Sequence, residues 1–376
     1  MIVMMQTADL GIERMTATAG DIAAINLESA RQRSWSRFWR APEQAGIAEG
    51  IVEQEQLTAQ FMGDLSAFDR LEMLVTELAR AEPESGRALL IAAQVACSTH
   101  RFAEARESLG LAVARGVTPE VADRLSLTID QATGANLPAV LAARRQRAKR
   151  PGHWEERIPL GALLADLGEF DEAERTYVEA LRTYPDVSPF APAWACFQLG
   201  VLWGECIPAP QPERAAQWYR TAIEYLPGYV KARVHLAEIY LDQGRTEDAR
   251  TLLVPALESG DPEVSWRLAD LAEAAGDRGE SAVHLAAARS GFEALLARHP
   301  LAFADHGAEF YLGSGDDPAR AFELAQMNVA NRPTRRALEQ AHAAALAAGE
   351  ADAADTLRVD AGERWGNAVP LPVTTD

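Results

Sequence analysis

Apolar residues recur every three or four positions along most of the chain, which is the spacing of one face of an α-helix. The run Leu71, Leu74, Val75 and Leu78 shows this spacing and is followed by Pro83, which cannot continue a helix. Alanine and leucine dominate the apolar positions, and runs of Val, Ile and Thr are scarce. Because this bias favours helix over strand, the sequence predicts an all-α fold.

The clearest structural unit spans residues 154–187 and consists of two expected helices separated by a turn. Small residues at Gly161 and Ala173 allow the two helices to approach closely, and Leu164 and Tyr177 fill the space beside them. Gly168 supplies the helix stop, because glycine tolerates positive φ. The full pattern comprises Leu160-Gly161, Gly168, Ala173, Tyr177, Ala180-Leu181 and the closing Pro185.

The small residue at position 173 recurs at a fixed interval. Ala105, Ala139 and Ala173 follow one another at intervals of 34 residues, and Ala215 and Ala249 are also 34 residues apart. This period and the residue pattern resemble the tetratricopeptide repeat, over roughly residues 52–361. The resemblance implies a right-handed superhelical solenoid of antiparallel helix pairs, in which each pair stacks only on its neighbours.

We expect the chain to divide into four segments. Residues 1–50 would form an N-terminal segment with an amphipathic capping helix, and residues 51–150 would hold degenerate repeats, the weakest of them at 120–149. Residues 151–362 would hold further repeats, with a divergent unit near 262–300 whose second helix is several residues too long. Residues 363–376 would be a flexible tail, because they contain prolines and small polar residues.

Two proline-rich segments interrupt the period, at residues 186–192 and 207–212. Proline is not tolerated inside a helix, so we expect both segments to be loops. Insertions in a solenoid project from one face, often the binding face. The loops could therefore contact a partner, or they could be passive spacers that change the superhelical pitch; the second interpretation is favoured.

Two segments concentrate positive charge. The expected helix at 21–39 carries several arginines beside Trp35, Phe38 and Trp39, which is typical of a membrane-surface or docking helix, but also of a cap over the open end of the first repeat. The cap is favoured. Residues 144–150 could form a nucleic-acid patch, but they follow a helix whose C-terminal dipole favours cations, so a solvated helix end is the preferred interpretation.

The overall charge narrows the possible partners. The formal net charge is −19, from 55 acidic and 36 basic residues, and such a surface repels phosphate backbones. We therefore expect no general nucleic-acid binding. The chain shows no stretch typical of a secretory signal or a transmembrane helix, and its 3 cysteines are too few for a disulfide framework. A cytoplasmic protein is the resulting expectation.

The sequence offers little chemistry. It lacks the Lys-Ser/Thr ending of a phosphate loop, a G-x-S-x-G elbow and an H-E-x-x-H zinc motif. His306 and Glu309 are three residues apart and would share a helix face, but a metal site would need a second such pair facing them. We expect no catalytic residues, no metal and no cofactor, and hence no enzyme.

The resemblance to tetratricopeptide repeats implies where a partner would bind. In that family the first helix of each unit lines a concave groove. Aromatic residues there would offer anchor contacts, and acidic residues would attract a basic group. The positions that carry over are Trp194, Phe197, Gln198, Val201, Lys231, His235, Glu238, Trp266, Arg267, Asp270, His306 and Phe310.

Two functions from different classes are compatible with this sequence. The favoured one is a non-enzymatic scaffold or adaptor that binds another protein or peptide in its concave groove. The alternative is an accessory subunit, substrate-presenting or regulatory, of an enzyme or biosynthetic complex. The sequence does not identify the partner, the pathway or the oligomeric state.

Overall fold

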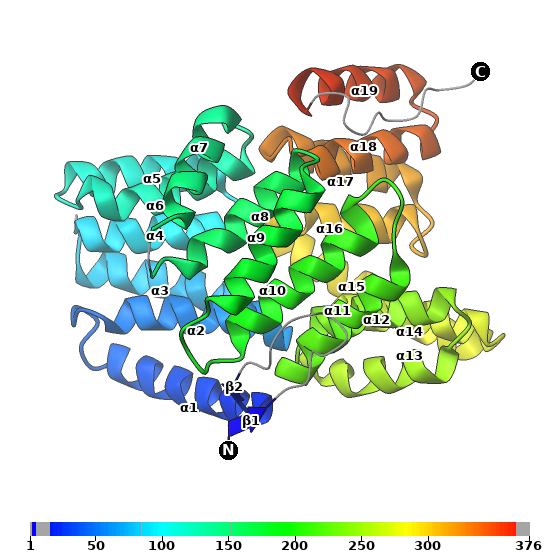
Figure 1. Cartoon of the computed structure of the whole chain (residues 1–376), viewed down its shortest axis with the longest axis horizontal. Coiled ribbons are helices and arrows are strands. Elements are labelled where there is room, and N and C mark those ends of the chain that lie inside the picture. Colours follow the sequence, from blue (N-terminus) through cyan, green and yellow to red (C-terminus); the bar gives the residue numbers. More distant parts are fainter. Residues whose placement is uncertain (1, 5–15, 84, 151, 366–376) are drawn as a thin grey trace.

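The chain folds into an array of antiparallel helices, shown in Figure 1 as a computed structural model. The structure describes residues 2–4, 16–83, 85–150 and 152–365. Within these residues, short helical segments of other types lie at Trp154–Glu156 (η2), Leu202–Cys206 (η3) and Val254–Ser259 (η4). The α-helices are α1 (Gly20–Phe38), α2 (Ile47–Met62), α3 (Ala67–Ala81), α4 (Gly86–Ser98), α5 (Phe102–Ala114), α6 (Pro119–Ala132), α7 (Leu137–Ala148), α8 (Arg157–Asp166), α9 (Phe170–Arg182), α10 (Phe190–Val201), α11 (Pro212–Tyr225), α12 (Val230–Asp242), α13 (Thr246–Leu253), α14 (Pro262–Ala274), α15 (Arg278–Arg298), α16 (Pro300–Leu312), α17 (Pro318–Asn331), α18 (Arg335–Ala347) and α19 (Ala351–Trp365).

Consecutive helices pack as pairs, and the pairs stack into a superhelical solenoid. The close pairs include α4 with α5, α8 with α9, α10 with α11, and each later pair up to α18 with α19. The expected helix at 21–39 is present as α1, which packs along α2. The prediction of an all-α solenoid of helix pairs is confirmed. A short antiparallel pairing of β1 (Ile2–Met4) with β2 (Thr16–Thr18) was not expected.

Close helix packing explains why two first helices, α8 and α10, carry a glycine where they cross their partner helices. A Cβ added to Gly161 would lie 2.6 Å from the ring of Tyr177, so only glycine fits where α8 crosses α9. Gly200 on α10 faces Tyr219 on α11 in the same way. Gly168, between α8 and α9, has φ 79°, the left-handed conformation that the turn requires.

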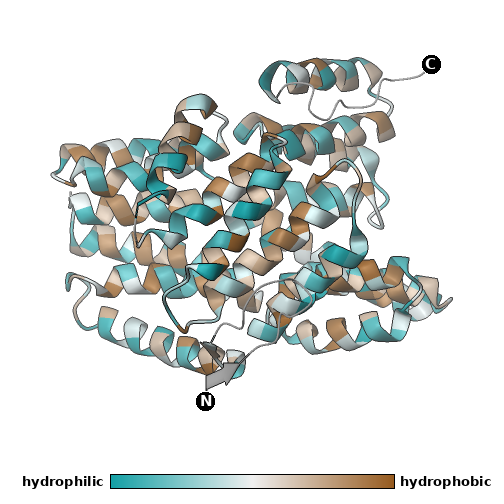
Figure 2. Ribbon diagram, viewed as in Figure 1, coloured by the Kyte–Doolittle hydropathy of each residue, from teal (hydrophilic) through white to brown (hydrophobic). Residues whose placement is uncertain are grey.

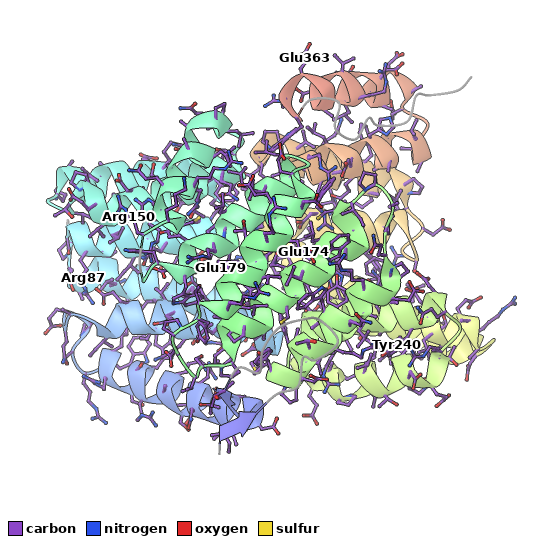
Figure 3. The ribbon with its side chains drawn as sticks, viewed as in Figure 1. Arg87, Arg150, Glu174, Glu179, Tyr240 and Glu363 are labelled. Atoms are coloured by element: carbon purple, nitrogen blue, oxygen red, sulfur yellow. The ribbon has the colours of Figure 1, made fainter. Side chains whose placement is uncertain are left out.

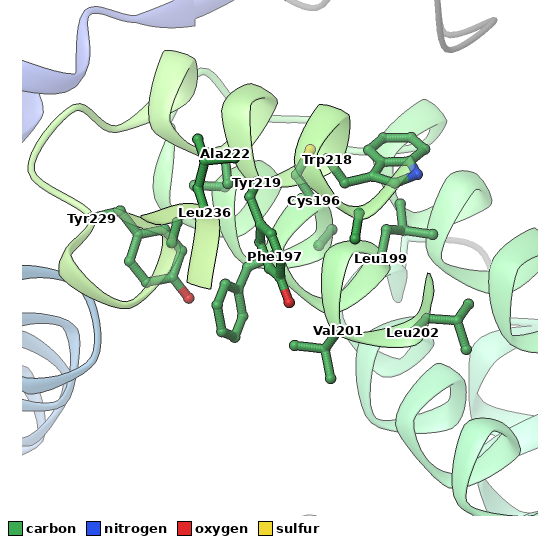
Figure 4. Packing of buried hydrophobic residues seen from close by; sticks show 14 of the residues in the cluster. Cys196, Phe197, Leu199, Val201, Leu202, Trp218, Tyr219, Ala222, Tyr229 and Leu236 are labelled. Atoms are coloured by element: carbon green, nitrogen blue, oxygen red, sulfur yellow. The ribbon is translucent and has the colours of Figure 1, made fainter. Parts of the chain in front are cut away.

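The interior of the array is made by the facing sides of neighbouring helices. Figure 2 shows helices that carry both hydrophobic and hydrophilic residues, as expected when each buries one stripe against its neighbours. The largest cluster of buried apolar residues runs from Ala148 at the end of α7 to α14 and includes Phe61 of α2, and a second cluster runs from α14 to α18. In the larger cluster Phe197, Tyr219 and Tyr229 point toward one another (Figure 4), with ring centroids 5.3 to 5.5 Å from Phe197.

Three sequence-based expectations about irregular segments are tested by the structure. The long second helix of the divergent unit is confirmed, since α15 has 21 residues. The expectation that residues 186–192 contain no helix is wrong, because α10 begins at Phe190. Pro192 lies in its first turn, where a backbone N–H has no partner within the helix. Pro212 begins α11 for the same reason.

The third expectation concerned the arginines at 144–150. A fully solvated helix end is wrong, because Arg144 is buried at the end of α7 and pairs with the buried Glu156 at 3.2 Å. Its guanidinium also donates to Thr128 and Gln131 on α6. This ion pair joins the weakest predicted repeat, α6 and α7, to the segment that precedes α8. A residue 12 positions away in sequence supplies the partner, so periodicity alone gives no sign of it.

The array also closes on itself across large sequence distances. Asp69 in α3 accepts from Nε2 of His299 at 2.8 Å and pairs with Arg298, both at the end of the long α15. Nδ1 of His100, in the turn between α4 and α5, donates to the carbonyl oxygen of Leu301 at 3.2 Å. Asn331 donates to the His100 carbonyl oxygen at 2.8 Å. Together, the contacts of Asp69 and of His100 join the N-terminal pairs to α15, α16 and α17. We refer to this set of contacts as the closing contact.

Candidate partner-binding groove

The first helices of the five C-terminal pairs bring charged side chains together on one inner side of the superhelix. Ion pairs arrange these charges in a network of two parts. One part joins η3, α12, α14, α16 and α18, and the other joins Glu263 on α14 to His306 and Asp305 on α16. We call this network the inner charged row. Its members are Glu205, His235, Glu238, Glu263, Arg267, Asp305, His306, Glu309 and Arg336.

One end of the inner charged row is centred on Glu205, which lies in η3 at the end of α10. Its carboxylate accepts from Nδ1 of His235 at 2.9 Å and from Arg336 on α18 at 2.7 Å. Burial alone would raise the pKa of Glu205, but His235 and Arg336 outweigh it and hold that pKa far below its usual range. Burial would lower the pKa of His235, yet Glu205 raises it to about 9. Glu205 therefore links three helices as an anion at neutral pH.

Arg267 on α14 occupies the middle of the inner charged row. Its guanidinium pairs with Glu238 on α12 and lies 3.6 Å from Glu309 on α16. The same group stacks 3.6 Å above the centre of the Trp266 ring and pairs with Asp270 at 3.3 Å. Glu309 keeps 57% of its side chain exposed to solvent.

The other end of the inner charged row is centred on His306 on α16. Its Nδ1 pairs with Glu263 on α14, and the adjacent Asp305 pairs with Arg332. Burial would lower the pKa of His306, but the carboxylates of Asp305 and Glu263 outweigh it and raise that pKa to about 9. Within the described residues no three His, Cys, Asp or Glu side chains are placed to hold a metal ion. His306 thus acts as a cationic bridge between α14 and α16.

Several of the expected groove residues are core residues instead. Phe310 is fully buried against Phe292 and Trp266, with ring centroids 4.8 and 5.5 Å away, and Trp266 donates from Nε1 to Ser314. Phe197 and Val201 are also buried. The expectation that Phe197, Trp266 and Phe310 offer exposed anchor contacts is wrong, because these rings fill the space between neighbouring helices. Trp194 and Gln198 are half-buried.

The polar residues expected in the groove lie on the inner side. His235, Glu238, Arg267 and His306 belong to the inner charged row, and Asp270 and the half-buried Lys231 lie beside it. Glu205, Glu263, Asp305, Glu309 and Arg336 were not among the expected groove residues, although the sequence places Glu309 on the same helix face as His306.

Sequence spacing could have found two of the missed residues. Glu263 precedes Arg267 by four residues, as Lys231 precedes His235. Glu309 follows His306 by three residues, as Glu238 follows His235 and Asp270 follows Arg267. The inclusion of Phe310 was therefore an error of one residue in register. Glu205 has no such signal, because it lies in the irregular η3.

Residues 209–269 match the model of the tetratricopeptide repeat family. The match includes Ala215 and Ala249, which mark one of the 34-residue intervals. No curated protein matches the sequence. Among the described residues, none of the helices is both long enough and apolar enough to cross a bilayer.

Solved structures of helical repeat proteins are similar to this chain at low identity. One is the Cut9–Hcn1 hetero-tetramer of the APC/C, with 14% identity and a TM-score of 0.43; the match covers 87% of this chain and 64%, less than two thirds, of that one. Yeast Tom70 gives 12% identity and a TM-score of 0.31, covering 92% of this chain and 94% of that one. A tetratricopeptide repeat protein from Parabacteroides merdae gives 18% identity and a TM-score of 0.34. That match covers 71% of this chain and 93% of the other.

Proposed function

We propose that this chain is a tetratricopeptide-type repeat protein and a non-enzymatic scaffold that binds a segment of another protein along its inner charged row; the match of residues 209–269 to the family model and the solenoid of helix pairs support this. Such solenoids stack short repeats into an extended concave surface, and that surface is their usual means of recognition.

One observation carries the proposal: charges from five consecutive pairs face the same side, and two of them keep about half of their side chain exposed. Glu309 and Arg336, at 57% and 52% exposed, are its most accessible members. In a network that only stabilises the fold, both charges of each ion pair would lie out of contact with water. Each charge would then need its partner, because an unpaired buried charge is costly. The accessible carboxylate and guanidinium are instead available to a ligand.

The alternation of charge along the row favours a polar partner over an apolar one. Phe197, Trp266 and Phe310 are buried, so they supply a rigid wall rather than anchor pockets. A ligand would gain affinity from charged and backbone hydrogen bonds to Glu309 and Arg336. We therefore expect an extended segment with both a basic and an acidic group, bound with marked salt dependence.

The test is affinity capture from the native cell with wild-type protein and with the double variant Glu309→Lys/Arg336→Glu. The matched control is Glu247→Lys/Arg182→Glu, which makes the same changes at exposed positions of the second helices α13 and α9. A specific partner retained by wild type and control, but lost by the groove variant with unchanged circular dichroism, supports the proposal. Equal capture by all three proteins contradicts it.

Mass spectrometry of the captured material also separates the two functions. A folded protein that stays bound through one of its segments fits a scaffold. A peptide-length or carrier-bound ligand, together with an enzyme, fits the alternative of an accessory subunit.

A further inference from the structure

Among the residues that the structure describes, none covers the outer face of α1 or of α19, the first and last helices of the array. In Figure 1 α1 and α19 lie at opposite ends of the molecule. α1 packs along α2, and α19 packs along α18. Every internal pair has a neighbour on both sides, whereas a terminal pair has one neighbour only. The outer faces of α1 and α19 are therefore the places where the stack could continue.

The outer face of α1 combines apolar and basic residues. Ile25 is 61% and Trp39 55% exposed, and Ile22 lies one turn before Ile25. Arg33 and Arg37 are exposed on the same helix and have no ion-pair partner within the described part of the chain. By contrast, Arg31 on the opposite face is held by Glu28 and Glu55. This basic face is unusual in a chain with a net charge of −19.

The outer face of α19 has an acidic excess at Asp352 and Glu363, because Asp355 and Asp360 pair with Arg358 and Arg364 of the same helix. Ala354, Ala361 and Trp365 are buried on one side of the helix, and Asp352, Val359 and Glu363 are exposed on the other. Figure 3 shows Glu363 at the edge of α19 that faces away from α18. A shallow concavity on this helix is lined by Asp355, Thr356, Leu357, Val359, Asp360 and Glu363.

We propose that α1 of one copy of this chain docks on α19 of a second copy, head to tail. The basic α1 face complements the acidic α19 face, and each face offers apolar contacts to the other. The docked helices would stack as neighbouring pairs do within one chain. Such an interface joins two different surfaces, so it generates open chains or rings rather than closed two-fold dimers.

A second copy suits this pair of faces better than other occupants. An anionic bilayer could attract Arg33 and Arg37, but it would repel the remaining acidic surface and leave the α19 face unused. An unrelated acidic protein would also leave α19 unused. The second copy is the occupant that satisfies both faces at once.

The experiment is sedimentation velocity across a concentration series, with four forms of the full chain. These are wild type, the α1 variant Arg33→Glu/Arg37→Glu, the α19 variant Asp352→Arg/Glu363→Arg, and the fourfold variant that combines them. Arg182→Glu on α9 is the control for a change of charge alone. We expect concentration-dependent association of wild type, weakened about tenfold or more in either double variant, and recovered in the fourfold variant, whose charges are again complementary.

Three outcomes would overturn the proposal. One is a wild type that stays monomeric up to its solubility limit. Another is association that persists unchanged in both double variants. The third is association that is lost in the double variants and does not return in the fourfold variant, since α1 would then have another partner. A monomeric wild type that binds phosphatidylserine vesicles through Arg33 and Arg37 would assign the face to membranes instead. The groove variant changes Glu309 on α16 and Arg336 on α18, whereas association is tested at α1 and α19. Failure of the proposed scaffold function would therefore leave the sedimentation result unaffected.

Discussion

At the scale of single residues, a shift of one position separates core from groove. Phe310 is fully buried, whereas the preceding Glu309 is the most exposed member of the inner charged row. Successive residues on a helix point about 100° apart, so a pattern read one residue out of register exchanges these environments. Trp266 and Arg267 form a second such pair, in which the buried ring supports the guanidinium of its neighbour.

The first prediction uses this adjacent pair of residues. Phe310→Ala should lower the free energy of unfolding by about 3–5 kcal/mol, because it leaves a cavity between α14, α15 and α16. Glu309→Ala should change it by less than about 1 kcal/mol, since an exposed ion pair contributes little. Urea titration followed by circular dichroism measures both. Comparable losses in the two variants would place Glu309 in the core and remove it from the candidate groove.

At the scale of elements, the sequence predicted the helix pairs well and their irregular junctions poorly. The pairing of two helices depends on residues that are close in sequence, as Gly161 on α8 and Tyr177 on α9 show. The same residue types therefore recur at the repeat period. η3 has no such period, yet it places Glu205 where α10, α12 and α18 meet. The first turn of α10 was also missed, because the position of Pro192 within a helix decides whether it is tolerated.

The second prediction concerns the two histidines that bridge neighbouring first helices. The pKa values of His235 and His306 are raised to about 9 in the folded chain, mainly by Glu205 for the first, and by Asp305 and Glu263 for the second, against the opposing effect of burial. A histidine with a raised folded pKa stabilises the fold fully below its unfolded pKa of about 6.5, and this contribution is lost as pH rises through the folded pKa. Stability should therefore fall as the pH is raised from about 6.5 to beyond 9.

The measurement compares thermal unfolding of wild type and His235→Gln/His306→Gln between neutral and alkaline pH. Other groups also titrate in this range, so the difference between the two proteins isolates the histidines. That difference should be greatest near neutral pH and shrink as the pH passes 9. A constant difference would show that the two imidazoles are neutral in the folded chain.

At the scale of the whole molecule, the closing contact was beyond sequence reasoning. Asp69 and His299 are separated by 230 positions, and no period relates them. The long α15 explains the contact, because its last turn carries Arg298 and leads directly into His299. A helix length that looked like repeat divergence in the sequence thus has a structural consequence. At this junction the superhelix is held by polar contacts at Asp69 and at His100, and Phe68 adds ring contacts with His299 and Phe303.

Opening the closing contact should loosen the superhelix without unfolding its pairs. The variant Asp69→Asn/Asn331→Ala removes the charge that holds Arg298 and His299, and the amide that donates to His100. Because the pairs stack on near neighbours, α8 and α9 should keep their hydrogen-exchange protection while α3, α4 and α15–α17 lose part of theirs. Small-angle X-ray scattering should show a larger radius of gyration. Asp171→Asn on the exposed face of α9 is the control.

The same variant tests whether closure regulates access to the inner charged row. If the closed form hinders entry of a partner, opening it raises the fraction of binding-competent molecules and tightens apparent binding in proportion. Partner capture should then be stronger in the opened variant than in wild type. If exchange increases at α3 and α15 but capture falls, the closing contact organises the groove rather than restricting it. Unchanged exchange and scattering would show that stacking alone maintains the closed superhelix.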